Sequence, residues 1–241
     1  MQGIELLVRH SFAPNRLHYC GDDDYSSRIQ QFIQSRDPTL GQTLKKEYTT
    51  FRAAFGYVKT IAESVQKNPF DFEVAEAYWI GNALLDHVSS DILSKLFLTR
   101  FSAGEYLGSE LAAEMAAQLP AKIYPHHSFH VLYLHFLSGK VPVTLPNINH
   151  CLILPAKVLD VSPGKLTVEK KPFEIHNGDF RIGKPVHQEI DRFFSDPIQT
   201  GDWVSVHWNT YCMTLTPLQK ENLEKYTAAN LALLNAASIF S

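Results

Sequence analysis

The sequence predicts an α+β protein, with an N-terminal all-helical domain over residues 1–140 and a small β domain with a C-terminal helix over residues 141–241. Helical spacing of apolar residues runs through the first half of the chain, whereas prolines and β-branched residues become frequent after Gly139. A proline-led amphipathic segment closes the chain. Because 45% of the residues are apolar, the chain can bury a substantial core and we expect it to be folded throughout.

The helical half shows apolar residues at i, i+3 and i+4, as in Ile29, Phe32 and Ile33. Prolines 38, 69 and 120 supply the breaks between helices. The spacing predicts helices over residues 25–35, 43–66, 71–86, 89–101 and 104–119, with a sixth over 124–139. The segment from Arg9 to Asp24 is interpreted as an ordered arm that precedes the first helix, with Asp23 or Asp24 at the helix start.

The second half contains Pro142, Pro146, Pro155 and Pro163, which exclude long helices there. Ser-Pro-Gly at 162–164 predicts a hairpin between a strand that follows Cys151, over 152–161, and another over 165–170. Further strands are predicted over 203–207 and 210–216. Pro217 then suits the first position of a helix that reaches about residue 235.

Charge and motifs exclude several classes of function. The net charge is only -3 and no dense Lys/Arg run is present, which argues against nucleic-acid or anionic-membrane partners. No segment approaches the ~18 apolar residues of a membrane span, and the N-terminus does not resemble a secretory signal. The three cysteines are far apart, so we expect reduced thiols in a cytoplasmic protein. Without a phosphate-binding glycine loop or a nucleophile elbow, kinase, dehydrogenase and hydrolase functions are disfavoured.

Four histidines lie close together at His126, His127, His130 and His135. On a helix, His126 and His130 share one face and His127 faces another side, so the first two could bind a metal. The alternative is that these rings pack in the core or bond to the backbone.

Three other residues are candidate metal ligands. Glu73 and Glu76 lie one helical turn apart, and helical bundles bind paired iron with carboxylates and histidines. A solvated first helical turn explains Glu73 equally well. Cys20 lies near His18, which could lower the pKa of its thiol, although a half-buried structural cysteine is an alternative.

Two segments carry a family resemblance. Residues 151–158 read Cys-Leu-Ile-Leu-Pro-Ala-Lys-Val, and residues 201–207 read Gly-Asp-Trp-Val-Ser-Val-His. In this order they resemble the two signatures of HypC-type chaperones of nickel-iron hydrogenase maturation, over about residues 150–235. The departures are the internal position of Cys151, Ala156 in place of glycine, and residues 172–200, which insert an extra loop or helix.

The resemblance implies a five-stranded OB-like barrel with a terminal helix. It also implies that Cys151 is the thiolate ligand of an iron that carries CO and CN ligands, and that His207 stands beside it. A soft thiolate suits such iron, and an imidazole can ligate it or hydrogen-bond to it. The helical half, through Tyr-Cys-Gly at 19–21, Trp-Ile-Gly-Asn at 79–82 and His-His-Ser-Phe-His at 126–130, is similar to an uncharacterised hydrogenase-associated family that carries no known chemistry.

The leading hypothesis is therefore an accessory protein, a metallochaperone for nickel-iron hydrogenase assembly. It would bind an iron fragment, or the large-subunit precursor and other maturation proteins, through Cys151 and His207. This requires the two side chains to share one site, within about 10 Å of each other, and it predicts that His126, His127 or His130 of the helical domain lies near them. The alternatives are a helical-domain metalloenzyme of di-iron or haem type that makes or processes a diatomic ligand, with the barrel as its docking module, and a scaffold without metal.

Overall fold

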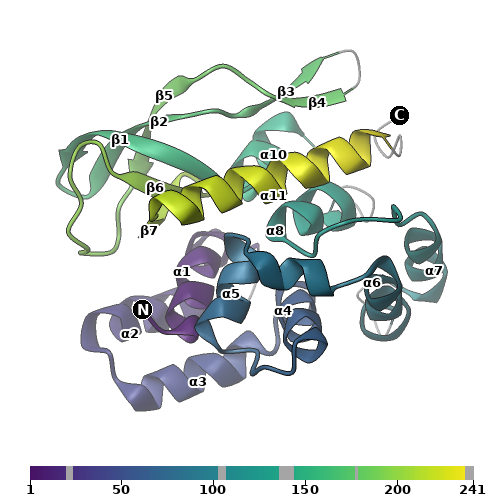
Figure 1. Cartoon of the computed structure of the whole chain (residues 1–241). Helices are drawn as coiled ribbons and strands as arrows, with labels where there is room; N and C mark the ends of the chain where they lie inside the picture. The colour runs from purple at the N-terminus through teal and green to yellow at the C-terminus, as the bar shows by residue number, and fades with distance from the viewer. Residues whose placement is uncertain (20–23, 103–106, 136–143, 177–178, 237–241) are drawn as a thin grey trace.

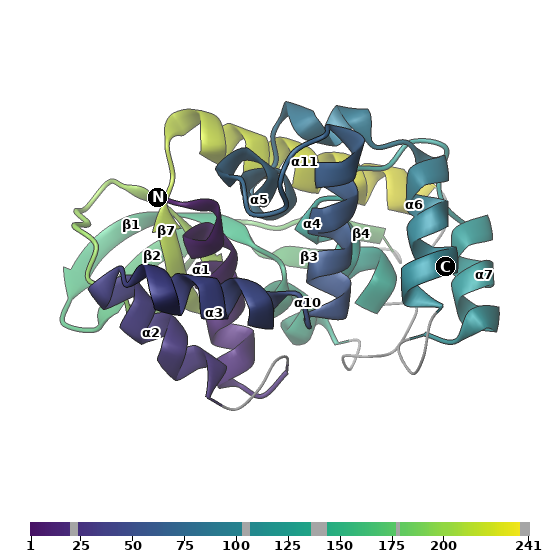
Figure 2. The same cartoon turned by 90° about the horizontal axis from the view of Figure 1, so that it is seen from below.

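The computed structural model describes residues 1–19, 24–102, 107–135, 144–176 and 179–236, and it confirms the α+β class. Figure 1 shows two layers: strands at the top and helices below, with the long closing helix lying across the junction between them. Seen from below in Figure 2, the first three helices lie under the strands at one end, and helices α6 (Ser90–Leu96) and α7 (Ser109–Ala117) lie at the other.

The helical layer is built from seven α-helices among the described residues. They are α1 (Gly3–Arg16), α2 (Tyr25–Ser35), α3 (Pro38–Tyr48), α4 (Arg52–Ser64), α5 (Phe72–Trp79), α6 (Ser90–Leu96) and α7 (Ser109–Ala117). A 3₁₀ turn, η1 (Ala83–His87), follows α5, and a π-helical turn, η2 (Phe97–Phe101), follows α6. The predicted helix over 25–35 is confirmed, and those over 89–101 and 104–119 are found in shortened or interrupted form.

The single helix predicted over 43–66 is wrong, because α3 ends at Tyr48 and α4 begins at Arg52. The hydroxyls of Thr49 and Thr50 donate to the carbonyls of Lys46 and Glu47, at 2.6 and 2.7 Å. Such side-chain bonds offer the backbone an alternative to the helical ladder. Two adjacent threonines therefore end the helix.

The helix predicted over 71–86 is also interrupted. Gly81 has φ +96°, which ends α5, and the Asn82 side chain then accepts from the Leu84 N–H at 3.0 Å to start η1. A Cβ added to Gly81 would lie 2.3 Å from Cδ2 of Tyr226 on the closing helix, α11 (Pro217–Ala236). This glycine is therefore required by both its backbone angle and its packing.

Gly81→Ala is expected to destabilise the protein by about 2–3 kcal/mol, because the strained backbone and the contact with Tyr226 both disfavour a side chain. The measurement is a thermal or denaturant unfolding curve. Gly164→Ala is the matched control, because Gly164 has φ +73° but nothing within 4 Å of the added Cβ. Equal losses in the two variants would show that the approach of Tyr226 carries no cost.

The interpretation of residues 9–24 as an arm is wrong as far as Arg16. These residues continue α1, which is buried on all sides from Gly3 to Asn15 and contains Pro14. A helix covered all round has no polar stripe, and a proline normally signals a helix end. Because of these two features, the spacing of apolar residues does not predict helix α1.

The sheet contains five strands: β1 (Leu154–Ser162), β2 (Lys165–Lys170), β5 (Val186–Asp191), β6 (Trp203–His207) and β7 (Thr210–Thr214). Their order is β1-β2-β5-β7-β6, and β6 pairs back with β1, which gives the ring of an OB-like barrel. Only one residue pair, Asp191 with Thr210, joins β5 to β7. The ring is thus nearly open at that seam.

The insertion over 172–200 is not simply a loop or helix. It forms the hairpin β3 (Phe173–His176) and β4 (Asp179–Ile182), and then β5, which is the third strand of the ring. Alternation is weak in β5, where only Ile190 is buried. A strand that buries one side chain gives little signal in the sequence.

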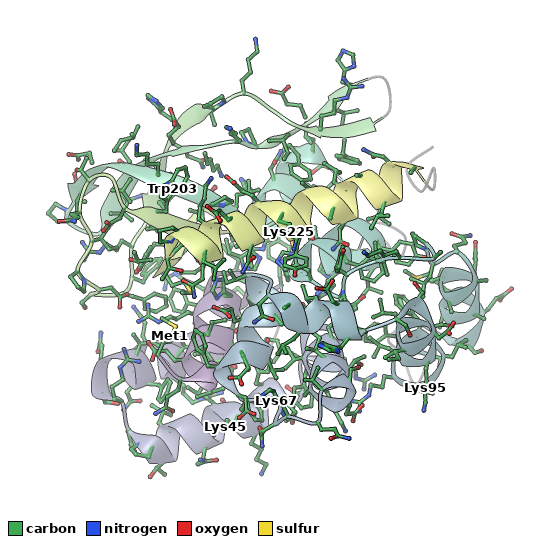
Figure 3. The ribbon with its side chains drawn as sticks, viewed as in Figure 1. Met1, Lys45, Lys67, Lys95, Trp203 and Lys225 are labelled. Atoms are coloured by element: carbon green, nitrogen blue, oxygen red, sulfur yellow. The ribbon has the colours of Figure 1, made fainter. Side chains whose placement is uncertain are left out.

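Helix α11 joins the two layers. It buries Leu223, Tyr226 and Leu231 at helical spacing. The ammonium of its Lys220 lies 4.9 Å from the ring centre of Trp203, the first residue of β6, which Figure 3 labels. One continuous hydrophobic cluster extends from Ile4 through the strands to Leu234. The predicted domain boundary at residue 140 falls in 136–143, outside the described residues.

Buried charges also join the layers. Arg9 of α1 is 1% exposed and donates to both carboxylate oxygens of Asp196, at 2.7 and 3.0 Å. It donates as well to Glu5, at 3.0 Å, and to the carbonyl of Cys212 on β7, at 3.1 Å. The guanidinium thus holds the N-terminal helix against the barrel.

Among the described residues, no helix combines the length and apolar character needed to cross a membrane.

Candidate metal centre

Three side chains from distant parts of the chain converge on one point. The ligand atoms of His127, Cys151 and His207 all lie within 4.8 Å of one another, and all three residues are buried. Cys151 and His207 thus share one site, as the leading hypothesis requires. We call these residues the three-donor group.

Each donor sits at the end of an element. His127 is the first residue of the short helix α8 (His127–Phe129), Cys151 is the last residue of α10 (Leu145–Cys151), and His207 is the last residue of β6. The position of Cys151 differs slightly from the prediction, because β1 begins only at Leu154. Ends of elements let side chains from the helical layer and the barrel meet without interrupting either.

The turn between β6 and β7 places His207 beside Cys151. Trp208 and Asn209 both have positive φ, 49° and 53°, as a two-residue hairpin turn of the type I′ class requires. The Trp208 N–H donates to the carbonyl of His150 at 2.7 Å, and Asn209 contacts the His150 ring at 3.1 Å. The turn is therefore fastened to the residue that precedes Cys151.

The tautomer of His207 is set by helix α1. Its Nδ1 lies 2.6 Å from the backbone carbonyl oxygen of His10, so Nδ1 carries the proton and donates. Pro14 has no N–H, so the carbonyl of His10, four residues earlier, lacks its usual helical donor. The proline thus leaves this carbonyl available to orient His207.

The remaining nitrogen of His207, Nε2, is buried and makes no hydrogen bond of normal geometry among the described residues, although the backbone of Cys151 lies near enough to this ring to act against the lowering of its pKa. With Nδ1 protonated, Nε2 presents a lone pair to Cys151 and His127. Metal-binding histidines commonly donate their other nitrogen to a backbone carbonyl in this way. A buried lone pair without a donor is costly, and a metal ion would satisfy it.

His127 is held by its neighbours in the helical layer. The His126 side chain caps α8 by accepting from the Ser128 N–H at 3.1 Å, and the ring of His127 packs 4.5 Å from that of Trp79. Trp79 stacks in turn on His10, at 5.3 Å and 17°. Nδ1 of His127 is buried without a partner among the described residues.

Burial keeps these rings neutral. It lowers the pKa of His207 to about 4 and the pKa of His127 well below its ordinary value. Neutral imidazole is the form that binds metals. The thiol of Cys151, which is 6% exposed, lies 3.8 Å from Nδ1 of His135, a ring whose pKa burial lowers to about 4.

A cavity of about 390 Å³ adjoins the three-donor group. Apolar and aromatic side chains form most of its wall, including Tyr19 and Trp208, whose rings stack at 4.4 Å. Among the described residues that line it, the exposed Arg52 is the one with a basic side chain other than histidine, and there is no carboxylate. All three donor residues form part of the cavity wall.

The expected pairing of His126 with His130 on one helical face is wrong. Helix α8 begins after His126, which caps it, and a π-helical turn, η3 (His130–His135), follows Phe129. These turns bring His127 to the group, and it is one of the three histidines expected near Cys151 and His207. His130 lines the same cavity and its Nδ1 lies 2.6 Å from the hydroxyl of Tyr78.

The carboxylates predicted as ligands lie elsewhere. Glu73 is paired with Lys67 at 2.7 Å, with 46% of its side chain exposed, on the outer side of the helices where Figure 3 labels Lys67. Glu76 accepts from Asn82 at 2.9 Å and from Gln219 at 2.8 Å. Neither carboxylate lines the cavity. Cys20 lies outside the described residues.

Residues that the sequence did not single out complete the surroundings: His10, which orients His207, Trp79, which packs between His10 and His127, and Tyr78, which bonds His130. Pro14 inside α1 is the sequence signal for the role of His10. It has this meaning only once α1 is known to be a helix, and the sequence pattern does not predict that helix.

The donor set fits a transition metal. One thiolate and two imidazoles are soft and borderline ligands, which suit zinc, copper and iron and do not suit magnesium or calcium.

The comparisons give a family without a known activity. The family model described as "Family of unknown function (DUF6390)" matches residues 1–240. No curated protein and no solved structure matches the chain.

Proposed function

The chain belongs to the DUF6390 family, and we propose that it is a metal-binding accessory protein of nickel-iron hydrogenase assembly. In this proposal Cys151, His207 and His127 bind iron, or an iron fragment that carries CO and CN ligands, as cargo. The partners are then the hydrogenase large subunit and other maturation proteins.

One observation carries the metal-binding part of the proposal: the thiol and the two imidazoles meet within 4.8 Å, although they come from three separate segments. The hydrogenase part rests on the resemblance of residues 151–158 and 201–207 to HypC-type signatures, whose cysteine and histidine are the two residues that meet. His127 adds a third donor from outside that resemblance.

The alternative, a di-iron or haem enzyme of the helical layer, gains less support. Its carboxylate candidates, Glu73 and Glu76, make bonds away from the cavity. The donors that do converge include a cysteine, which favours a thiolate centre.

The test is anaerobic purification followed by iron analysis and infrared spectroscopy in the carbonyl and cyanide stretching region. We expect bound iron, with stretching bands when the hydrogenase assembly proteins are co-expressed. Cys151→Ser and His207→Ala are each expected to weaken metal binding by more than the ~10–100-fold that loss of an outer partner costs.

Cys212→Ser is the matched control. Cys212 is also buried, on β7, and its thiol donates to the Thr210 carbonyl, which a serine hydroxyl can replace. The control should keep the metal. Iron that survives both Cys151→Ser and His207→Ala would contradict the proposed site, and two irons or a haem bound without Cys151 would favour the enzyme alternative.

A further inference from the structure

A metal bound by the three-donor group would have one coordination position that the group does not fill. Four-coordinate structural sites are closed by four protein ligands, whereas sites with three protein ligands hold a water or another small ligand in the fourth position. Among the described residues, the group supplies three donors, and the cavity of about 390 Å³ opens beside them.

His130 presents an unused hydrogen-bonding group in the same cavity. Its ring centre is 5.5 Å from that of His127, it is 6% exposed, and its Nε2 has no partner among the described residues. The hydroxyl of Tyr78, 2.6 Å from Nδ1, is placed to donate to that nitrogen. In the neutral ring the proton is then on Nε2, which becomes a buried donor without an acceptor among the described residues.

The composition of the cavity wall is compatible with a negatively charged ligand. Its described residues include no carboxylate, and most of the wall is apolar. A bound divalent metal adds positive charge at the three-donor group. The metal and a neutral imidazole N–H together form a site for an anion.

We infer that a metal held by His127, Cys151 and His207 keeps an open coordination position toward the cavity, and that this position takes a small anion hydrogen-bonded by His130. The inference rests on the metal site of the proposed function and adds a second ligand-binding role to it. His130 is a positioning residue for the anion, and Tyr78 sets the tautomer of His130.

The experiment uses the full chain loaded with Co²⁺, whose visible absorption reports its ligands, and titrates azide as the probe anion. We expect a saturable spectral change. His130→Ala should raise the azide Kd about tenfold or more, since a hydrogen bond to a charged ligand is lost, while Co²⁺ affinity stays unchanged. His130→Gln, which keeps an N–H donor, should recover part of the azide affinity.

His187→Ala, at a histidine on β5 whose side chain is 67% exposed, is the matched control and should leave both affinities unchanged. A wild-type Co²⁺ spectrum that does not respond to azide overturns the inference and leaves the metal site standing. Loss of Co²⁺ affinity in His130→Ala would make His130 a ligand and also overturn it. Absence of Co²⁺ binding in the wild type would overturn the metal site itself.

Discussion

Lowering the pH from about 7.5 to about 5.5 is expected to unfold the metal-free protein, or to remove most of its stability. Six histidines, five of them buried and His135 partly buried, have pKa values below that of an ordinary histidine because burial disfavours the imidazolium. They are His10 and His126, with pKa values of about 3, His135 and His207, at about 4, and His127 and His130, lowered well below 6.5.

The direction follows from proton binding. The unfolded chain protonates its histidines near pH 6.5, whereas the folded chain does not until pH falls to about 4 and below. Stability is therefore complete above about pH 6.5 and falls as pH decreases toward the folded-state values. Each histidine contributes about 1.4 kcal/mol per pH unit inside that window, so six together rival the ~5–15 kcal/mol stability of a typical domain.

Denaturant unfolding in the presence of a chelator, at a series of pH values, measures this slope. His10→Gln should reduce the slope by one proton, because Gln cannot titrate, and His187→Gln, at the exposed control position, should leave it unchanged. Equal stability at the two ends of the pH range would contradict the expectation.

Arg9→Met is expected to cost about 3–5 kcal/mol, the loss typical of breaking a buried ion pair. Removing the guanidinium takes away the ion pairs that Arg9 forms with Asp196 and with Glu5, which is only 4% exposed and keeps its second ion pair, with Arg36. The favourable contacts of the guanidinium with the Phe194 ring, at 4.7 Å, are lost as well.

The free energy of unfolding at neutral pH is the measurement for Arg9→Met. Lys165→Met is the control, because Lys165 also contacts two carboxylates, Glu189 and Asp191, but has 46% of its side chain exposed. Surface pairs of that kind contribute about 0–1 kcal/mol. Similar losses in the two variants would show that burial does not amplify the Arg9 contacts.

The predictable parts of the fold are those with a local signal. Helix α2, strands β2 and β6 and the start of α11 at Pro217 lie where periodicity, turn residues and a helix-initiating proline place them. Helix α1 and strand β5 were missed, because one is buried on every side and the other buries little. In neither segment do apolar and polar residues alternate in a way that predicts the helix or the strand.

The site divides in the same way. Short sequence signatures pair Cys151 with His207. How close the two side chains come depends on how the strands close into a ring, which the sequence does not reveal. The choice of His127 over His126 depends on where α8 begins, and a helix of three residues leaves no periodicity to read. Helix boundaries shift with one capping contact, so single-residue assignments there need the structure.

The contact between His10 and His207 joins two segments that are 197 residues apart in the sequence. During translation α1 emerges first, yet the strand end that it orients and the Asp196 that neutralises Arg9 appear only after most of the chain has been made. Contacts of such long sequence separation carry a loop-closure cost, so they slow folding. The three-donor group needs residues 127, 151 and 207, so it cannot assemble until the chain has been made at least as far as β6. Under the proposed function, a fragment that stops before β6 is therefore expected to bind the metal more weakly than the full chain.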